Sequence, residues 1–296
     1  MLPVIPIMRA FGQNATNVVL RRPGQRFLSA PVPVAPFANE HWEFAWLSDV
    51  AYLETAAGQK HVEKMRENAP DPVPPLMAAG WRRWDNFPGE ELLKQINETH
   101  LRVQVWERNE PPAVAVTFGG TVFNNNADWW ANLRWFFPWH RDEYTDVVQR
   151  FAPAFRDELK GCSQSMDPLR LSRLELYSTG HSLGGGLAQQ FAYSVPLDCV
   201  KHVSQVYAFD PSPVTGFFSV MRSLRTANKK GLLIDRIYER GEILALLRSL
   251  TSLFHKPSAK NAAIRGVRYF AFWAWNAIAA HSIVELAAKI DAARRA

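Results

Sequence analysis

The chain has 296 residues, of which 47% are hydrophobic and 21% are charged. This length and balance predict a globular protein that buries a sizeable core, and they exclude a disordered or low-complexity chain. The two cysteines, Cys162 and Cys199, have neither the spacing of metal ligands nor the density of a disulfide scaffold. We expect two structural thiols, and the sequence leaves a single bridge between them open without supporting it.

The net charge of +6 is unevenly distributed. The segment 229–296 holds twelve Lys and Arg against five Asp and Glu, whereas the first 228 residues carry a net charge of −1. A basic C-terminal third is suited to peripheral contact with an anionic membrane, although a solvated surface without a partner is the simpler interpretation. Because no zinc-finger or RNA-binding motif accompanies the charge, we expect no nucleic-acid partner.

No segment is predicted to span a membrane. The longest apolar run, 269–280, has twelve residues and is broken by Asn276, whereas a spanning helix needs about 20. The N-terminal sequence MLPVIPIMRAFG has no basic residue before its apolar stretch, which two prolines interrupt, so it predicts no cleaved secretory signal. We therefore expect a cytoplasmic protein or one exported without a cleaved signal, and the sequence does not choose between them.

In chain order, the first segment, 1–38, is rich in Pro and Gly and predicts an extended arm. A single domain is expected over 39–296. From about Asn39, the apolar residues of EHWEFAWLSDVAYLE fall on one broad face, which predicts a helix. The stretch DPVPP at 71–75 predicts a loop.

Two strands are predicted next. LRVQVWER (101–108) alternates apolar and polar residues, whereas AVAVTF (113–118) is almost wholly apolar, as a strand covered on both faces would be. The turn NEPP between them predicts a hairpin. Strands and helices then alternate: helices over 141–159, 183–193, 217–227, 242–250 and 282–293, and strands over 173–180, 202–210 and 232–240. This alternation predicts an α/β fold with a mostly parallel sheet flanked by helices.

The sharpest motif is Gly180-His181-Ser182-Leu183-Gly184, a G-x-S-x-G sequence directly after a predicted strand and before a predicted helix. In this arrangement the chain turns so tightly at the serine that side chains two residues away on either side would collide. The glycines remove that bulk, and the serine hydroxyl is raised at a helix N-terminus that favours negative charge. We interpret Ser182 as a nucleophile. A phosphate-binding loop is the competing interpretation, but the Lys of a P-loop is missing.

The motif and its surroundings resemble the class 3 lipases, which include fungal triacylglycerol lipases and bacterial relatives. GHSLGG is the usual form of the turn in that family, and AVAVTFGGT resembles its strand ending in Phe-Arg-Gly-Ser/Thr. DWWANL, YAFDPSPVTG and HSI resemble later family segments, so the similarity spans roughly 101–286. The chain departs from the family at Gly119, where the family has Arg. The resemblance implies an α/β-hydrolase fold and ester hydrolysis.

A serine hydroxyl needs a base to take its proton. In this fold the order along the chain is serine, acid, histidine. Of the three histidines after Ser182, His202 begins a predicted strand at the wrong edge of the sheet, and His255 lies in a loop. His281 opens a predicted helix and matches the family position, so we select it as the base.

The orienting acid has two candidates. Glu242 follows the predicted strand 232–240, and RIYERGEIL resembles the family segment that carries its aspartate, so Glu242 is the preferred residue. Asp210 ends the preceding strand on the same edge and is the alternative. Asp235 lies early in its strand and is poorly placed.

A developing oxyanion needs preorganised donors. One is expected to be the backbone N–H of Leu183, the residue after the nucleophile. The family position for the second is Thr121, and the preceding Gly119 and Gly120 would permit a close backbone approach.

Aromatic residues crowd two segments, 129–139 and 269–275. By resemblance, 124–130 is where the family carries a lid, and the second cluster leads to His281 and would suit an acyl pocket. Core packing is the alternative for both. With the basic C-terminal third, the clusters favour a lipid or phospholipid ester as substrate.

These features predict a lipase, phospholipase or esterase that works through an acyl-enzyme and needs no cofactor or metal. An acyltransferase or thioesterase with the same triad is one alternative, and a non-catalytic lipid-binding or interaction protein is another. A secreted toxin with a partner immunity protein would also fit the missing signal; this idea rests on family-level analogy.

Overall fold

The computed structural model describes residues 17–54, 70–120, 143–212, 215–239, 258–259, 262–269 and 282–296. Within these ranges, nine strands form one sheet in the order β2-β1-β9-β8-β7-β6-β5-β4-β3. The strands are β1 (Asn17–Arg21), β2 (Val32–Pro33), β3 (Trp81–Arg83), β4 (Val103–Arg108), β5 (Ala113–Phe118), β6 (Glu175–His181), β7 (Val203–Phe209), β8 (Leu233–Glu239) and β9 (Ala263–Tyr269).

The centre of the sheet is parallel and its two edges are antiparallel. β5 to β9 pair in parallel, whereas β3, β4 and β1 pair antiparallel with their neighbours. The predicted hairpin is confirmed, because β4 pairs with β5 from Val103 opposite Phe118 to Arg108 opposite Ala113. The carboxyl ends of β5 to β8 therefore meet at one edge, where α/β proteins place their binding sites.

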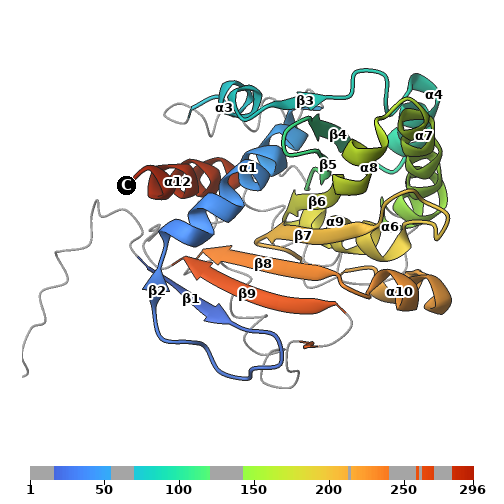
Figure 1. Cartoon of the computed structure of the whole chain (residues 1–296). Coiled ribbons are helices and arrows are strands. Elements are labelled where there is room, and N and C mark those ends of the chain that lie inside the picture. Colours follow the sequence, from blue (N-terminus) through green and yellow to red (C-terminus); the bar gives the residue numbers. More distant parts are fainter. Residues whose placement is uncertain are drawn as a thin grey trace, which may run out of the picture.

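Helices cover both faces of the sheet (Figure 1). On one face, α1 (Ala35–Val50) packs against α12 (Ile283–Arg295), and on the other α9 (Leu183–Ser194) packs against β5, β6 and β7. The remaining helical segments are η1 (Ala51–Glu54), α3 (Val73–Ala78), α4 (Glu90–Asn97), α6 (Glu143–Asp146), the π-helical turn η3 (Val147–Phe151), α7 (Ala152–Gln164), α8 (Pro168–Arg173), η4 (Phe217–Ser219) and α10 (Arg222–Asn228).

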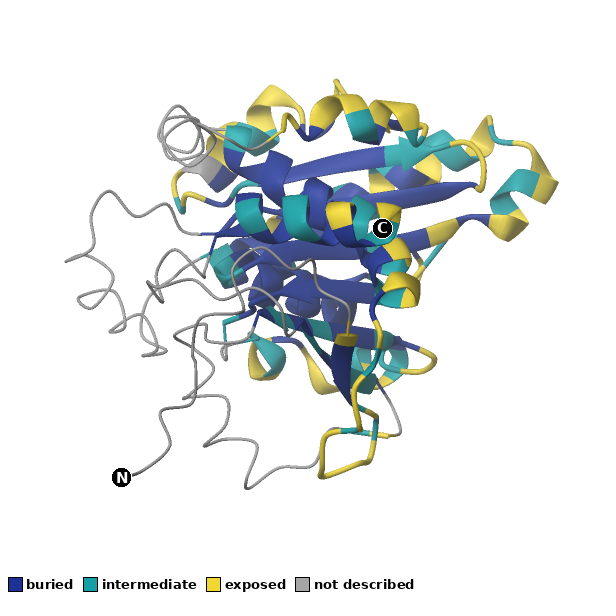
Figure 2. Ribbon diagram, turned by 90° about the vertical axis from the view of Figure 1, so that its left-hand side faces the viewer, coloured by how far each residue is buried: buried dark blue, intermediate teal, exposed yellow. Residues whose placement is uncertain are grey.

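The core lies in two layers, one on each face of the sheet. Along β7, Val206 and Ala208 join the layer beneath α9, whereas Tyr207 and Phe209 join the layer beneath α1. All six residues of β5 are buried, as predicted for a strand covered on both faces. Figure 2 shows the buried strands between partly exposed helices. The sheet and its flanking helices confirm the predicted α/β-hydrolase class.

The structure differs from the sequence prediction at several places. β3, α4 and α8 were not predicted, and the helix predicted over 217–227 is divided into η4 and α10. The stretch 71–75, predicted to be a loop, contains the start of α3, since prolines are compatible with a first helical turn and Asp71 accepts a hydrogen bond from the Val73 N–H (3.0 Å). β9 was not predicted, because Arg265, Gly266 and Arg268 interrupt its apolar residues. Part of the predicted arm, 17–33, forms β1 and β2, and β1 pairs with β9.

Among the helices that the structure describes, none combines the length and the apolar character needed to cross a bilayer.

Candidate active site

Ser182 lies at the turn between β6 and α9 in an unusual backbone conformation. Its φ is 57° and its ψ is −121°, a combination that residues with a Cβ rarely adopt. Two hydrogen bonds hold the turn: the Ser182 N–H donates to the Phe209 carbonyl (2.9 Å), and the Ser212 N–H donates to the Ser182 carbonyl (2.9 Å). Both partners come from β7 and the segment after it, so the neighbouring strand fixes the turn. Ser182 is half-buried and lies at the carboxyl edge of the sheet.

Glycines on both sides of Ser182 are required by space. A Cβ on Gly180 would lie 2.4 Å from the Gly184 carbonyl oxygen, and a Cβ on Gly184 would lie 2.2 Å from the Phe118 carbonyl oxygen. Both distances are far below any contact a methyl group tolerates, and the atoms met belong to the backbone. The steric reason for the G-x-S-x-G spacing is thus visible in the packing of β5, β6 and α9.

The backbone around Ser182 is suited to stabilise negative charge. Leu183 is the first residue of α9, and the Gly185 N–H donates to the Ser182 carbonyl (3.1 Å). N–H groups in the first turn of a helix point away from the helix and favour anions. Leu183, predicted to supply the first oxyanion donor, therefore lies in the first turn of this helix.

The second predicted donor, Thr121, lies outside the described residues, but the two residues before it border the turn. A Cβ on Gly120 would lie 2.6 Å from the His181 carbonyl oxygen. Gly119 lies beside Gly184, whose added Cβ would be 3.0 Å from the Gly119 carbonyl carbon. The segment leaving β5 therefore runs in direct contact with the serine turn.

Two residues near the turn, Tyr52 and Arg102, were missed by the sequence prediction. The Tyr52 hydroxyl, from η1, is 2.8 Å from Nδ1 of His181, the residue before the serine. The Arg102 guanidinium lies over the Tyr52 ring (5.6 Å) and donates a short hydrogen bond to the Gly120 carbonyl. No sequence signal connects these residues, because 129 residues separate Tyr52 from His181.

Asp210, the alternative acid, lies at the same edge as Ser182. It is fully buried, directly follows β7, and has a φ of 38°, in the left-handed region. Its N–H donates to the Ile237 carbonyl (2.8 Å), and its Oδ1 accepts from the Glu239 N–H (3.3 Å). β8 therefore holds Asp210 in a fixed position. The preferred acid, Glu242, lies outside the described residues.

Glu239, at the end of β8, is a buried carboxyl group that the sequence analysis did not consider. Lys289 of α12 contacts its Oε1 (3.3 Å) and also contacts Glu285 (3.2 Å). Burial and the nearby Asp210 carboxylate raise the pKa of Glu239 to about 8, although Lys289 acts in the opposite direction. The raised pKa favours the protonated form of Glu239 at neutral pH.

The predicted base, His281, and the other downstream candidate His255 lie outside the described residues. Ser282, which follows His281 in the sequence, is buried and is the N-cap of α12, where its Oγ accepts from the Glu285 N–H (3.5 Å). His202 is exposed and precedes β7, at the opposite edge of the sheet from Ser182.

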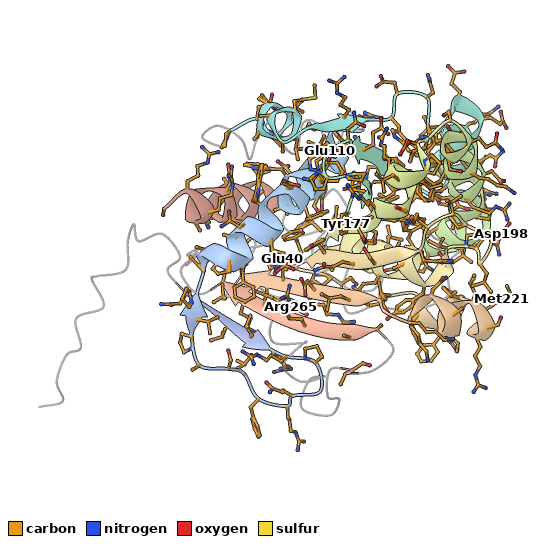
Figure 3. All side chains as sticks on the ribbon, in the orientation of Figure 1. Glu40, Glu110, Tyr177, Asp198, Met221 and Arg265 are labelled. Atoms are coloured by element: carbon orange, nitrogen blue, oxygen red, sulfur yellow. The ribbon has the colours of Figure 1, made fainter. Side chains whose placement is uncertain are left out.

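A second buried charge cluster lies beneath α1, away from Ser182. Glu40, His41 and Asp235 bring ligand-type atoms within 4.8 Å of one another. The Arg265 guanidinium contacts Glu40 (2.6 Å) and Asp235 (2.5 Å), so a protein cation already pairs with both carboxylates. Glu40 and Arg265 are labelled in Figure 3. The pKa of Asp235 is lowered by its contacts with His41 and Arg265, which outweigh its burial. We therefore interpret this cluster as structural, in agreement with the poor placement expected for Asp235.

The aromatic clusters lie mostly outside the described residues, including all of 129–139. Within the second cluster, Tyr269 is fully buried and its hydroxyl is 2.9 Å from Nδ1 of His41. This residue belongs to the core beneath α1.

No protein-family model matches the chain, and no curated protein matches its sequence. Several solved structures are similar to the chain, among them the following three. The native propeptide complex of Rhizomucor miehei lipase is 16% identical with a TM-score of 0.46, covering 73% of this chain and 65% of that one. A deletion mutant of that complex is 16% identical with a TM-score of 0.44, covering 72% and 62%. A fungal lipase–inhibitor complex is 15% identical with a TM-score of 0.41, covering 69% and 72%. The chain thus spans less than two thirds of the two Rhizomucor miehei chains. The fold assignment rests on the sheet and helices described above.

Proposed function

We propose that the chain is a serine hydrolase that cleaves carboxylic esters of lipids, with Ser182 as its nucleophile. The observation that carries this proposal is the backbone at Ser182: a half-buried serine with a φ of 57° between a strand and the first turn of a helix. Strained conformations of this kind are concentrated at functional sites, because surrounding structure must hold them in place. Gly180 and Gly184 allow the chain to reach this conformation, because a Cβ at either position would clash with backbone atoms.

The proposed reaction forms and breaks an acyl-enzyme. The Ser182 oxygen attacks the ester carbonyl carbon while His281 takes the hydroxyl proton, and the Leu183 and Thr121 N–H groups bind the resulting oxyanion. The C–O bond to the alcohol then breaks, and His281 returns the proton to the leaving oxygen. Water, deprotonated by His281, attacks the acyl-enzyme and releases the acid and free Ser182.

For the orienting acid, we keep two candidates and propose a direct comparison. Asp210 gains support from its burial and from the Glu239 N–H that fixes its carboxylate. Glu242 keeps the support of the sequence resemblance. Asp210→Asn and Glu242→Gln each preserve shape while removing the charge. The true acid is the one whose replacement lowers kcat by the larger factor, about 10⁴-fold in a well-studied serine protease.

The substrate class follows from the aromatic segments, the basic C-terminal third and the class 3 lipase resemblance. We expect long-chain lipid or phospholipid esters, hydrolysed faster at an interface than in solution. Emulsified long-chain esters and soluble short-chain esters, assayed together, test this. A strong preference for short-chain esters without any gain at an interface would contradict it.

The proposal of a nucleophile is tested by covalent labelling. A fluorophosphonate probe should label the wild-type chain at Ser182 and leave Ser182→Ala unlabelled, and hydrolysis should disappear in the same variant. A wild-type chain that binds lipid without labelling or hydrolysis would instead be the non-catalytic binding protein. Labelling without hydrolysis, combined with transfer to an alcohol, amine or thiol acceptor, would identify an acyltransferase.

A further inference from the structure

Arg102 holds the backbone segment that leaves β5. Its carbonyl accepts a hydrogen bond from the Gly119 N–H (3.0 Å), and its guanidinium Nη2 donates to the Gly120 carbonyl. Arg102 thus binds two successive residues, Gly119 through its main chain and Gly120 through its side chain. Both residues directly precede Thr121 in the sequence.

Gly119 and Gly120 have no room for a side chain. A Cβ on Gly119 would lie 3.0 Å from the Arg102 Cβ and 3.0 Å from the Ala51 carbonyl oxygen. A Cβ on Gly120 would lie 2.3 Å from the Tyr52 hydroxyl. Any side chain at either glycine would therefore push the segment away from Arg102 or from the serine turn.

The position of Arg102 costs the guanidinium part of its hydration. Burial lowers the pKa of its guanidinium, and Tyr52 and Glu143 offset part of that effect. The Tyr52 ring lies beneath the guanidinium at 5.6 Å, and the Tyr52 hydroxyl contacts His181. A partly desolvated cation thus lies between the segment after β5 and the Tyr52 ring, and Tyr52 in turn contacts the residue before Ser182.

We propose that Arg102 is a positioning residue that sets the direction of the Thr121 N–H, the second oxyanion donor; this inference rests on the proposed function. The Gly120 carbonyl and the Thr121 N–H belong to one planar peptide group. A hydrogen bond that fixes the carbonyl therefore also fixes the N–H. Because the donor is charged, it also polarises the peptide group and strengthens the N–H as a donor.

The experiment compares Arg102→Met and Arg102→Lys with the control Arg108→Met. Arg108 ends β4, and its guanidinium lies over the Trp81 ring (4.8 Å) and contacts Glu43 (2.6 Å). It therefore matches Arg102 as a half-buried arginine over an aromatic ring, but it lies at the other end of the strand. Each variant is assayed for kcat, KM, thermal stability and affinity for a trifluoromethyl ketone, which forms a tetrahedral adduct with the serine.

If Arg102 acts through the oxyanion donor, Arg102→Met should lower kcat about 10–100-fold, less than complete loss of one donor, which costs about 10²–10³-fold. Affinity for the ketone should fall by a similar factor, and KM should stay within about twofold. Arg102→Lys keeps the charge and should recover part of the kcat. Arg108→Met should lose stability without losing ketone affinity relative to wild type.

Two results would overturn the inference while leaving the proposed function intact. One is an active wild type whose kcat and ketone affinity are unchanged by both Arg102 substitutions. The other is a loss that tracks thermal stability equally in the Arg102 and Arg108 variants, which would indicate a structural role only. If Arg102→Met does not fold, kcat, ketone affinity and thermal stability are compared in Arg102→Lys and Tyr52→Phe instead. A wild type without Ser182-dependent labelling would overturn the proposed function itself.

Discussion

The raised pKa of Glu239 predicts that the free energy of unfolding falls as the pH rises from 4.5 to about 8. Its side chain is buried at the end of β8, close to the Asp210 carboxylate, and its Oε2 has no hydrogen-bond partner among the described residues. The folded state therefore favours the neutral acid, whereas the unfolded chain ionises near the ordinary value of 4.5. Glu239→Gln imitates the neutral acid at every pH and removes this difference.

The magnitude follows from the two pKa values. One pKa unit corresponds to about 1.4 kcal/mol, so a pKa of about 8 against 4.5 amounts to roughly 5 kcal/mol in full. Because the pKa is raised in the folded state, the stabilising contribution is fully present below pH 4.5 and is lost as the pH rises to about 8. At pH 7, Glu239→Gln should therefore exceed the wild type in free energy of unfolding by about 3 kcal/mol.

Urea denaturation at intervals from pH 4.5 to pH 9 measures this difference. The advantage of Glu239→Gln should be near zero at pH 4.5, grow through the neutral range and level off above pH 8. Glu285→Gln is the matched control, since Glu285 contacts the same lysine from a partly exposed position on α12. It should change stability by less than about 1 kcal/mol. A Glu239→Gln difference that is constant across the range, or that shrinks as the pH rises, would refute the reasoning.

Two further predictions concern the turn at Ser182. Gly180→Ala places a Cβ 2.4 Å from the Gly184 carbonyl oxygen, so it should lower the free energy of unfolding by about 3 kcal/mol or more and abolish fluorophosphonate labelling. Gly161→Ala in α7, where nothing lies within 4 Å, should instead stabilise by roughly 0.5–1 kcal/mol in urea denaturation; equal effects would contradict the steric argument. Ser182→Gly should be more stable than Ser182→Ala by about 1 kcal/mol, because glycine adopts this φ and ψ without strain. Equal thermal stabilities would show that the turn is unstrained.

Much of the fold could be predicted from the pattern of apolar and polar residues along the chain. The strands β5 to β8 and the helices α1, α9 and α12 were predicted close to their observed bounds, because their hydrophobic patterns match the layers they join. β9 was missed because Arg265 interrupts its pattern, and only the contact with Asp235 of β8 explains a charged residue there.

Part of the candidate site could likewise be predicted from the sequence, whereas another part could not. Ser182, Gly180 and Gly184 were selected correctly as the parts of a cramped turn, since the atoms that clash are few residues apart or belong to adjacent strands. Glu239 was overlooked because its environment is set by Lys289, 50 residues later in the chain.

The sequence by itself determined the alternation of strands and helices and the tight turn at Ser182. Both depend on local sterics and on the period with which apolar residues recur, and neighbouring residues already contain that information. The protonation of Glu239 and the binding of the Gly120 carbonyl by Arg102 were decided by tertiary structure alone. Desolvation and short-range hydrogen bonding depend on which distant segments pack together. Packing brings Asp210 and α12 together around Glu239, and η1 and the segment after β5 together around Arg102.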